Sequence, residues 1–193
     1  MVRQDAGETP GEIDRLASSS DAARNGWQRT IEDTRAMAAD REKHGYETVV
    51  LLSDDTSPIA PASDRDHWGL TYLVSGGDRE AFRDARARAE FDETAVYQAS
   101  QEGNTFLVTE CLDHDAELVV FLAGVFRMEH AVELVRAALD RGEMHSHVRK
   151  LNGEVVDGIR HEDAEAFFPD PDAYYSYEPT EFVDTVGDGN EET

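Results

Sequence analysis

The sequence predicts an α+β domain in which a mainly antiparallel sheet of about five to seven strands packs against three main helices. The expected elements follow one another in the order helix, two strands, helix, three strands, helix and hairpin. Gly103-Asn104 and Asn152-Gly153 each separate two strand-like segments, a pattern that indicates antiparallel hairpins. Leu118–Leu122 is continuously apolar, which is typical of a strand covered on both faces.

The first helix is expected over residues 21–45, because apolar and small side chains recur there at helical spacing while Asp and Glu occupy the other face. Tyr46–Leu52 follows as a strand. Residues 54–69 contain two prolines and several acids, so they are expected to form a loop. Gly69–Ser75 then predicts a second strand.

The second helix is expected to begin after an N-cap at Asp78 and to run to about Glu90, with small and apolar residues on its inner face. Three strands should come next. Their expected ranges are Glu93–Ser100, Thr105–Glu110 and Glu117–Phe126.

The third helix is expected to begin at Met128, where apolar residues again recur at helical spacing, and to stop at Gly142. A hairpin over Met144–Ile159 follows. The order of the elements through this helix is similar to that of the roadblock/longin architecture, a scaffold of small interaction modules.

Both ends of the chain look different from the middle. Residues 1–20 are small and polar, and we expect them to be disordered. Residues 170–193 hold eight acids and no Lys or Arg, so this tail is also expected to be mostly disordered, with its aromatic residues partly docking it. Residues 21–169 are therefore expected to form a single domain.

The charge of the chain is strongly negative, at −24 from 42 acidic and 18 basic residues. The acids are spread along the whole sequence, and only Lys43 and Lys150 are lysines, so Arg supplies nearly all the positive charge. In about molar salt the Debye length falls to about 3 Å, which screens most of the self-repulsion. The composition therefore predicts a halophilic protein that folds in concentrated salt.

The same composition bounds the partners and the compartment. Phosphate contacts weaken steeply with salt, and a chain of charge −24 has no basic field, so we expect no nucleic acid and no anionic membrane as partner. The first twenty residues lack the apolar core of a secretion signal, and no apolar run is long enough for a membrane span. Cys111 is the only cysteine, which excludes an intrachain disulfide. We expect a cytoplasmic protein.

The candidate metal ligands are His145, His147, His161 and Asp163, with Glu162 as an alternative to Asp163. On a strand, His145 and His147 would point to the same face, where two neutral imidazoles can share Zn²⁺ or another divalent metal. No longer metal-binding motif supports this interpretation. The alternative is that these histidines lie on a solvated face or bond to nearby acids.

Two further motifs each allow one functional and one structural interpretation. Ser75–Asp78 lies between a strand and a helix N-terminus, where backbone N–H groups bind phosphate, but its glycines lack the spacing of phosphate loops and the turn can equally be a helix cap. Cys111 with His114 could form a nucleophile pair, although the acidic segment raises a thiol pKa, and a passive thiol is the alternative. We predict no catalytic residue from either motif.

Arg79, Arg83 and Arg86 lie on one face of the second expected helix, at a spacing of one turn. They could receive an anionic ligand or an acidic partner. Neighbouring acids on the same helix offer the alternative, which is that the arginines form local ion pairs.

Several short segments resemble a family of haloarchaeal proteins of unknown function. They are Trp68–Tyr72, Phe91–Glu93 with Val96-Tyr97, Phe106–Val108, Gly142–His145, and His161–Asp163 with Phe167–Pro169. The resemblance covers about residues 27–169. It implies a haloarchaeal source and one domain with loose ends, and it implies no activity.

Two functions remain open from the sequence. The first is a non-catalytic module that binds a protein partner or forms a homodimer through a sheet edge or a helix face. The second is a metal-binding protein or metal-dependent enzyme that uses His145, His147 and His161. No cofactor beyond that possible zinc or other divalent metal is implied.

Overall fold

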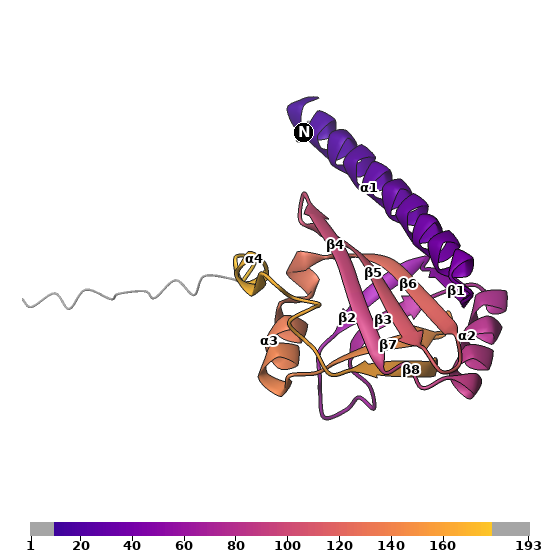
Figure 1. Cartoon of the computed structure of the whole chain (residues 1–193). Coiled ribbons are helices and arrows are strands. Elements are labelled where there is room, and N and C mark those ends of the chain that lie inside the picture. Colours follow the sequence, from indigo (N-terminus) through magenta and orange to yellow (C-terminus); the bar gives the residue numbers. More distant parts are fainter. Residues whose placement is uncertain (1–9, 179–193) are drawn as a thin grey trace, which may run out of the picture.

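The computed structural model describes residues 10–178, with side chains from Ser20 onward, and two four-stranded sheets form its centre (Figure 1). Sheet A has the strand order β1-β6-β5-β4, and sheet B has the order β2-β3-β7-β8. The elements are α1 (Pro10–Lys43), β1 (Glu47–Leu52), β2 (Asp55–Ile59), β3 (Gly69–Leu73), α2 (Gly76–Arg88), β4 (Glu93–Gln101), β5 (Asn104–Asp113), β6 (Leu118–Arg127), a 3₁₀ turn (Met128–His130), α3 (Val132–Arg141), β7 (Met144–Arg149), β8 (Val155–His161) and α4 (Pro171–Tyr175).

The predicted α+β class, the mainly antiparallel pairing and the three main helices are confirmed. Only β1 with β6 and β3 with β7 pair in parallel, and the other four pairings are antiparallel. The strands nevertheless divide into two sheets, whereas we expected one.

The larger hydrophobic core lies between the two sheets. Leu107 and Val120 of sheet A and Leu70 and Tyr72 of sheet B are almost fully buried in it. The sheets approach closely at Gly124, where an added Cβ would lie 2.2 Å from Thr56 Oγ1 and 2.9 Å from the Tyr72 ring. Helix α2 lies beside β1 and β8, and Figure 1 shows α3 on the other side of the sheets.

A second core joins α1 to the outer face of sheet A. Val119, Phe121 and Ala123 of β6 face α1, while the residues between them face sheet B. This alternation confirms that the apolar run of β6 is a central strand covered on both faces. The helix packs through small residues, and at Gly26 an added Cβ would lie 2.5 Å from Phe106 Cζ.

Strand β2 was not expected, because residues 54–69 were predicted to form a proline-containing loop. It is an edge strand of sheet B, and Pro58 lies within it, opposite Leu70 of β3. An edge position tolerates proline, since one side of the strand needs no backbone donor. The sequence of residues 54–69 alone did not indicate that part of this segment would pair with β3.

The described chain includes parts of both end segments. Helix α1 begins at Pro10, inside the segment 1–20, and α4 lies inside the segment 170–193. Tyr174 of α4 is buried and its hydroxyl lies 3.0 Å from Thr105 Oγ1, so an aromatic residue docks this part of the tail. The predictions for residues 1–9 and 179–193 lie outside the described residues. Among the helices of residues 10–178, none combines the length and apolar character needed to cross a membrane.

Candidate functional site

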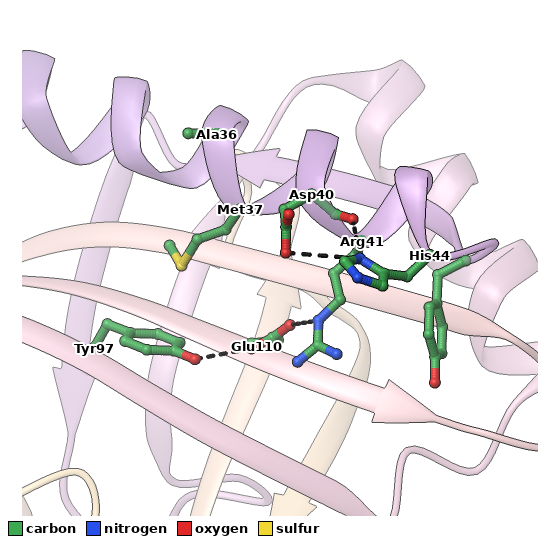
Figure 2. Close-up of a pocket in the computed structure, with 8 residues that line it drawn as sticks. Ala36, Met37, Asp40, Arg41, His44, Tyr97 and Glu110 are labelled. Carbon is green, nitrogen blue, oxygen red and sulfur yellow. Dashed lines mark hydrogen bonds and ion pairs between the residues drawn. The ribbon is translucent and has the colours of Figure 1, made fainter.

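A groove runs along the β4 side of α1, because this helix covers β1, β6 and β5 more fully than β4. Two cavities, of about 770 and about 160 Å³, open there and share Met37 and Tyr97 in their walls. The larger one has a polar end with Arg41 and Glu110 (Figure 2), and the smaller one has a mixed lining in which Phe106 and Val108 are apolar and Asp33 is charged. We call the two cavities together the α1–β4 groove.

The polar end of the groove is built on a buried carboxylate. Glu110 lies in the middle of β5 and is only 2% exposed. Arg41 Nε of α1 donates to one carboxylate oxygen at 2.6 Å, and Tyr97 Oη of β4 donates to the other at 3.1 Å. A buried charge is costly unless it is paired and hydrogen-bonded, and both conditions are met here. The pair fixes α1 on the sheet at this end of the groove.

Tyr97 connects the groove to the edge of sheet A. Its ring is 47% exposed, which is high for a large apolar side chain on a strand. Partial burial and the neighbouring Glu110 carboxylate raise the pKa of the Tyr97 hydroxyl above its ordinary value. The phenol therefore stays neutral and acts as a hydrogen-bond donor at physiological pH.

Strand β4 is the edge of sheet A on the groove side, and its residues Thr94–Gln101 include no charged side chain. With 31% charged residues overall, a stretch of eight would on average hold two or three charges. The segment contains neither Pro nor Gly, and its pairing with β5 is continuous from Glu93 to Gln101 without a bulge. It is a regular, neutral strand.

The other three sheet edges carry devices that discourage pairing with another chain. At the β1 edge, Glu47 bonds to Arg88 of α2, which lies alongside. Strand β2 holds Asp55 and Pro58. Strand β8 holds charged residues, contacts α2, and pairs with β7 through an irregular register at Val148/Arg149. Charges, proline, bulges and covering helices protect edge strands. Strand β4 has a charge only at its first residue, Glu93, which pairs with His114, and its segment Thr94–Gln101 has no charge, proline or bulge.

The predicted pair His145 and His147 does lie on one face of β7. Their rings are stacked, with centroids 5.8 Å apart and planes within 2°. Trp68 packs edge-on against His145, and His147 Nε2 lies 2.9 Å from the Trp68 carbonyl oxygen. Burial lowers the pKa of His147 to about 4, so this imidazole is neutral at physiological pH. His67, from the preceding loop, lies against His147 at 5.3 Å between ring centroids and was not anticipated from the sequence.

His161 points to the opposite face of sheet B, into the core. It pairs in register with Met144, whose side chain faces inward, while His145 and His147 alternate outward. Its two ring nitrogens lie 2.9 Å from Thr94 Oγ1 and 3.0 Å from Ser146 Oγ. Burial lowers the pKa of His161 to about 3.

Asp163 and Glu162 lie beyond the end of β8. Asp163 Oδ1 accepts a hydrogen bond from the Ala166 N–H and so closes a turn, and Glu162 pairs with Arg160. Within residues 20–178, no group of three or more His, Cys, Asp or Glu side chains is arranged to hold a metal ion. Metal binding by the four predicted ligands stays a prediction, which metal analysis of protein without an affinity tag would test.

The remaining sequence motifs have structural roles in the described chain. Ser75, not Asp78, caps α2, since its Oγ accepts the Asp78 N–H at 3.2 Å. Cys111 is fully buried, and burial raises the pKa of its thiol to about 12. Of the three arginines predicted to share one face of α2, Arg79 donates to the Val74 carbonyl oxygen, and Arg86 Nε lies 3.7 Å from Asp157 Oδ1.

The fold is α+β, and the features that remain at its surface are the uncharged β4 segment Thr94–Gln101 and the open groove beside it. The chain matches the model described as a family of unknown function (DUF7529) over residues 13–169, and it belongs to that family. The matched range begins within α1 and includes all eight strands. No curated protein and no solved structure matches the chain.

Proposed function

We propose that this chain is a non-catalytic protein-interaction module that binds through the free edge of β4 and the adjoining α1–β4 groove. The supporting observation is the neutral, regular β4 edge, in contrast to the three guarded edges of the same domain. An exposed edge strand offers backbone donors and acceptors to an added strand, which provides affinity. The groove, with Met37 and Phe106 in its walls, offers space for side chains that provide specificity.

The placement of the reactive groups also favours binding over catalysis. Ser146 and His161 form a serine–histidine pair, but both residues are at most 2% exposed, so a substrate does not reach them. The thiol of Cys111 is buried and protonated. At the groove, the Glu110 carboxylate is occupied by Arg41 and Tyr97 and serves to position α1.

The composition indicates where this module works. A net charge of −24 with only two lysines suits the concentrated salt of a haloarchaeal cytoplasm. In such salt charge steering is screened, while apolar burial is strengthened. An uncharged strand edge and the apolar part of the groove, around Met37 and Phe106, are the kinds of surface that keep their affinity under these conditions.

A photo-reactive amino acid placed at Ala99, on β4, tests the proposal in the cells that make the protein. Ala39 is the matched control, because it is an exposed alanine on the face of α1 away from the groove. We expect covalent protein adducts at Ala99 well above those at Ala39, identified by peptide mass spectrometry. Equal adduct yields at the two positions would show that β4 is not an interaction surface.

A further inference from the structure

The hydrogen-bonding groups of β4 alternate between β5 and the free edge. The two-residue turn Glu102-Gly103, with φ of 50° and 76°, makes Gln101 and Asn104 the first hydrogen-bonded pair of the hairpin. Hydrogen-bonded and non-hydrogen-bonded pairs alternate along an antiparallel ladder. The odd-numbered residues from Gln101 back to Glu93 therefore form their backbone hydrogen bonds with β5. Thr94, Val96, Gln98 and Ser100 therefore direct their N–H and C=O groups outward.

These outward groups are unused within the part of the chain that is described. None of the backbone hydrogen bonds outside the regular strands and helices involves residues 94–101. Gln98 does contact another segment, but through its side chain, which donates to the Ala166 and Phe167 carbonyl oxygens on the inner face. The outward backbone groups are thus available to a partner strand.

We propose that the partner strand is β4 of a second copy of this chain, paired antiparallel with Tyr97 at the two-fold axis. This inference rests on the proposed function and names its partner. An antiparallel strand is complementary to itself, because each outward donor meets an outward acceptor of the other copy. With Tyr97 opposite Tyr97, Val96 pairs with Gln98 and Thr94 with Ser100, so all four outward residues find partners.

Charge favours this antiparallel arrangement over a parallel self-pairing. In the antiparallel register centred on Tyr97, Glu93 of one copy lies opposite Gln101 of the other. A parallel in-register pairing would instead place Glu93 beside Glu93, and like charges in neighbouring strands are unfavourable. For two copies that each carry −24, the segment Thr94–Gln101 adds no carboxylate of its own to the contact, and the two acids that this register would place opposite each other, Asp92 and Glu102, lie just beyond the paired strands.

The outer face of the strand fits the same arrangement. Tyr97 projects from β4 between Ala95 and Ala99, so in the dimer the two tyrosine rings would lie side by side and be flanked by small residues. This contact explains the 47% exposure of Tyr97 in the single chain. Because α1 leaves β4 largely uncovered, the α1–β4 groove gives clearance for the second sheet, and the product is one eight-stranded sheet with both α1 helices on one face.

Sedimentation equilibrium of the full chain in about 2–3 M KCl, a range in which charge repulsion is screened, measures the assembly directly. We expect twice the chain mass of 21.5 kDa. Ser100→Pro removes an outward N–H from each copy and should weaken dimerisation by about tenfold or more. Ser100→Ala is the control, because it keeps that N–H and loses only the weak contact of the hydroxyl with Thr105 at 3.5 Å.

Engineered cysteines test the register, and the buried Cys111 does not interfere. Opposite residues of a non-hydrogen-bonded pair approach closely enough for a disulfide. Tyr97→Cys should form a covalent homodimer on mild oxidation. Ala95→Cys and Ala99→Cys should not do so alone, but their mixture should form a disulfide, because residue 95 of one copy faces residue 99 of the other.

The outcomes separate this inference from the proposed function. Twice the chain mass, weakening by Ser100→Pro only, and disulfides in the stated combinations support the second copy. A single-chain mass would overturn it. If the Ala99 probe then labels another protein, the interaction function still stands with a different partner, and if it labels residues 179–193 of the same chain, the edge is taken internally. A single-chain mass with no specific labelling at Ala99 overturns both.

Discussion

Arg41 and Glu110 join the longest helix to the middle of sheet A through a 2.6 Å ion pair whose carboxylate is only 3% exposed. Because Tyr97 occupies the second carboxylate oxygen, the charge of Glu110 is fully hydrogen-bonded. The pair lies at the polar end of the α1–β4 groove and fixes the distance between α1 and β4. The shape of the proposed interaction surface therefore depends on it.

Arg41→Ala should lower the free energy of unfolding by about 3 kcal/mol, because it leaves the Glu110 carboxylate buried without its cation. Urea denaturation in molar KCl measures the change. In the double variant Arg41→Leu with Glu110→Leu, no buried charge remains, and most of the lost stability should return. A single variant within about 0.5 kcal/mol of the parent would mean that solvent reaches the carboxylate.

Gly26→Ala should destabilise the protein, although alanine is the better helix former. An added Cβ at Gly26 would lie 2.5 Å from Phe106 Cζ, so either the phenyl ring or α1 must move. Overpacking of this kind costs about 1–3 kcal/mol, against about 1 kcal/mol gained in helix propensity.

Gly77→Ala is the matched control for that variant. Gly77 lies in the first turn of α2, and nothing approaches its added Cβ within 4 Å. This variant should be neutral or slightly more stable. Thermal unfolding of both variants compares them directly, and equal effects would show that α1 does not pack tightly on Phe106.

The sequence predicted those features that local periodicity determines. The two-residue period of a strand placed His145 and His147 on one face, and their stacked rings confirm it. The apolar run of β6 identified the central strand for the same reason. Helix α3 ended at Gly142 as expected, since this residue adopts the left-handed conformation of a C-cap.

Features that depend on pairing between distant segments were not predictable. The direction of His161 follows from its register with Met144 across a turn that is longer than Asn152-Gly153 alone. The division into two sheets follows from parallel pairing of β3 with β7, which no local pattern encodes. Glu110 gave a signal that was missed, because it lies between Val108 and Leu112 on one face of β5, and an acid between apolar residues on a strand face indicates a paired, buried charge.

Lowering the pH from 7 to 5 should reduce the free energy of unfolding more in the parent protein than in a variant that lacks the His161 imidazole. Its pKa is lowered from 6.5 to about 3 by burial, so the folded state holds the neutral ring and the unfolded state takes up a proton. The contribution to stability is complete above about pH 6.5 and decreases as the pH falls toward the folded-state pKa. Between pH 7 and pH 5 the loss from this one group is about 2 kcal/mol.

Because many carboxylates titrate in the same range, the test is a difference between two proteins. Urea denaturation of the parent and of His161→Gln at pH 7 and pH 5 isolates the contribution of this histidine. The variant should start less stable, since the bonds to Thr94 and Ser146 change, but it should lose less between the two pH values. An identical loss in both proteins would mean that His161 is protonated in the fold.

Salt should decide whether the chain folds at all, because 42 acids and 18 bases leave a charge of −24 on a chain of 193 residues. Circular dichroism should show helix and strand in about 2–3 M KCl and a substantial loss of both in dilute buffer, where the Debye length no longer falls below the spacing of surface charges.

Replacing KCl with sucrose separates two causes of this salt requirement, since sucrose strengthens apolar burial without screening charge. If sucrose alone restores folding, the salt requirement comes from the small hydrophobic core. If the chain folds equally well in dilute buffer, it has no salt requirement. If KCl restores folding and sucrose does not, repulsion between carboxylates is the cause. The segment Thr94–Gln101 of β4 is then a part of the sheet edge that adds no carboxylate of its own to that repulsion when two such chains meet.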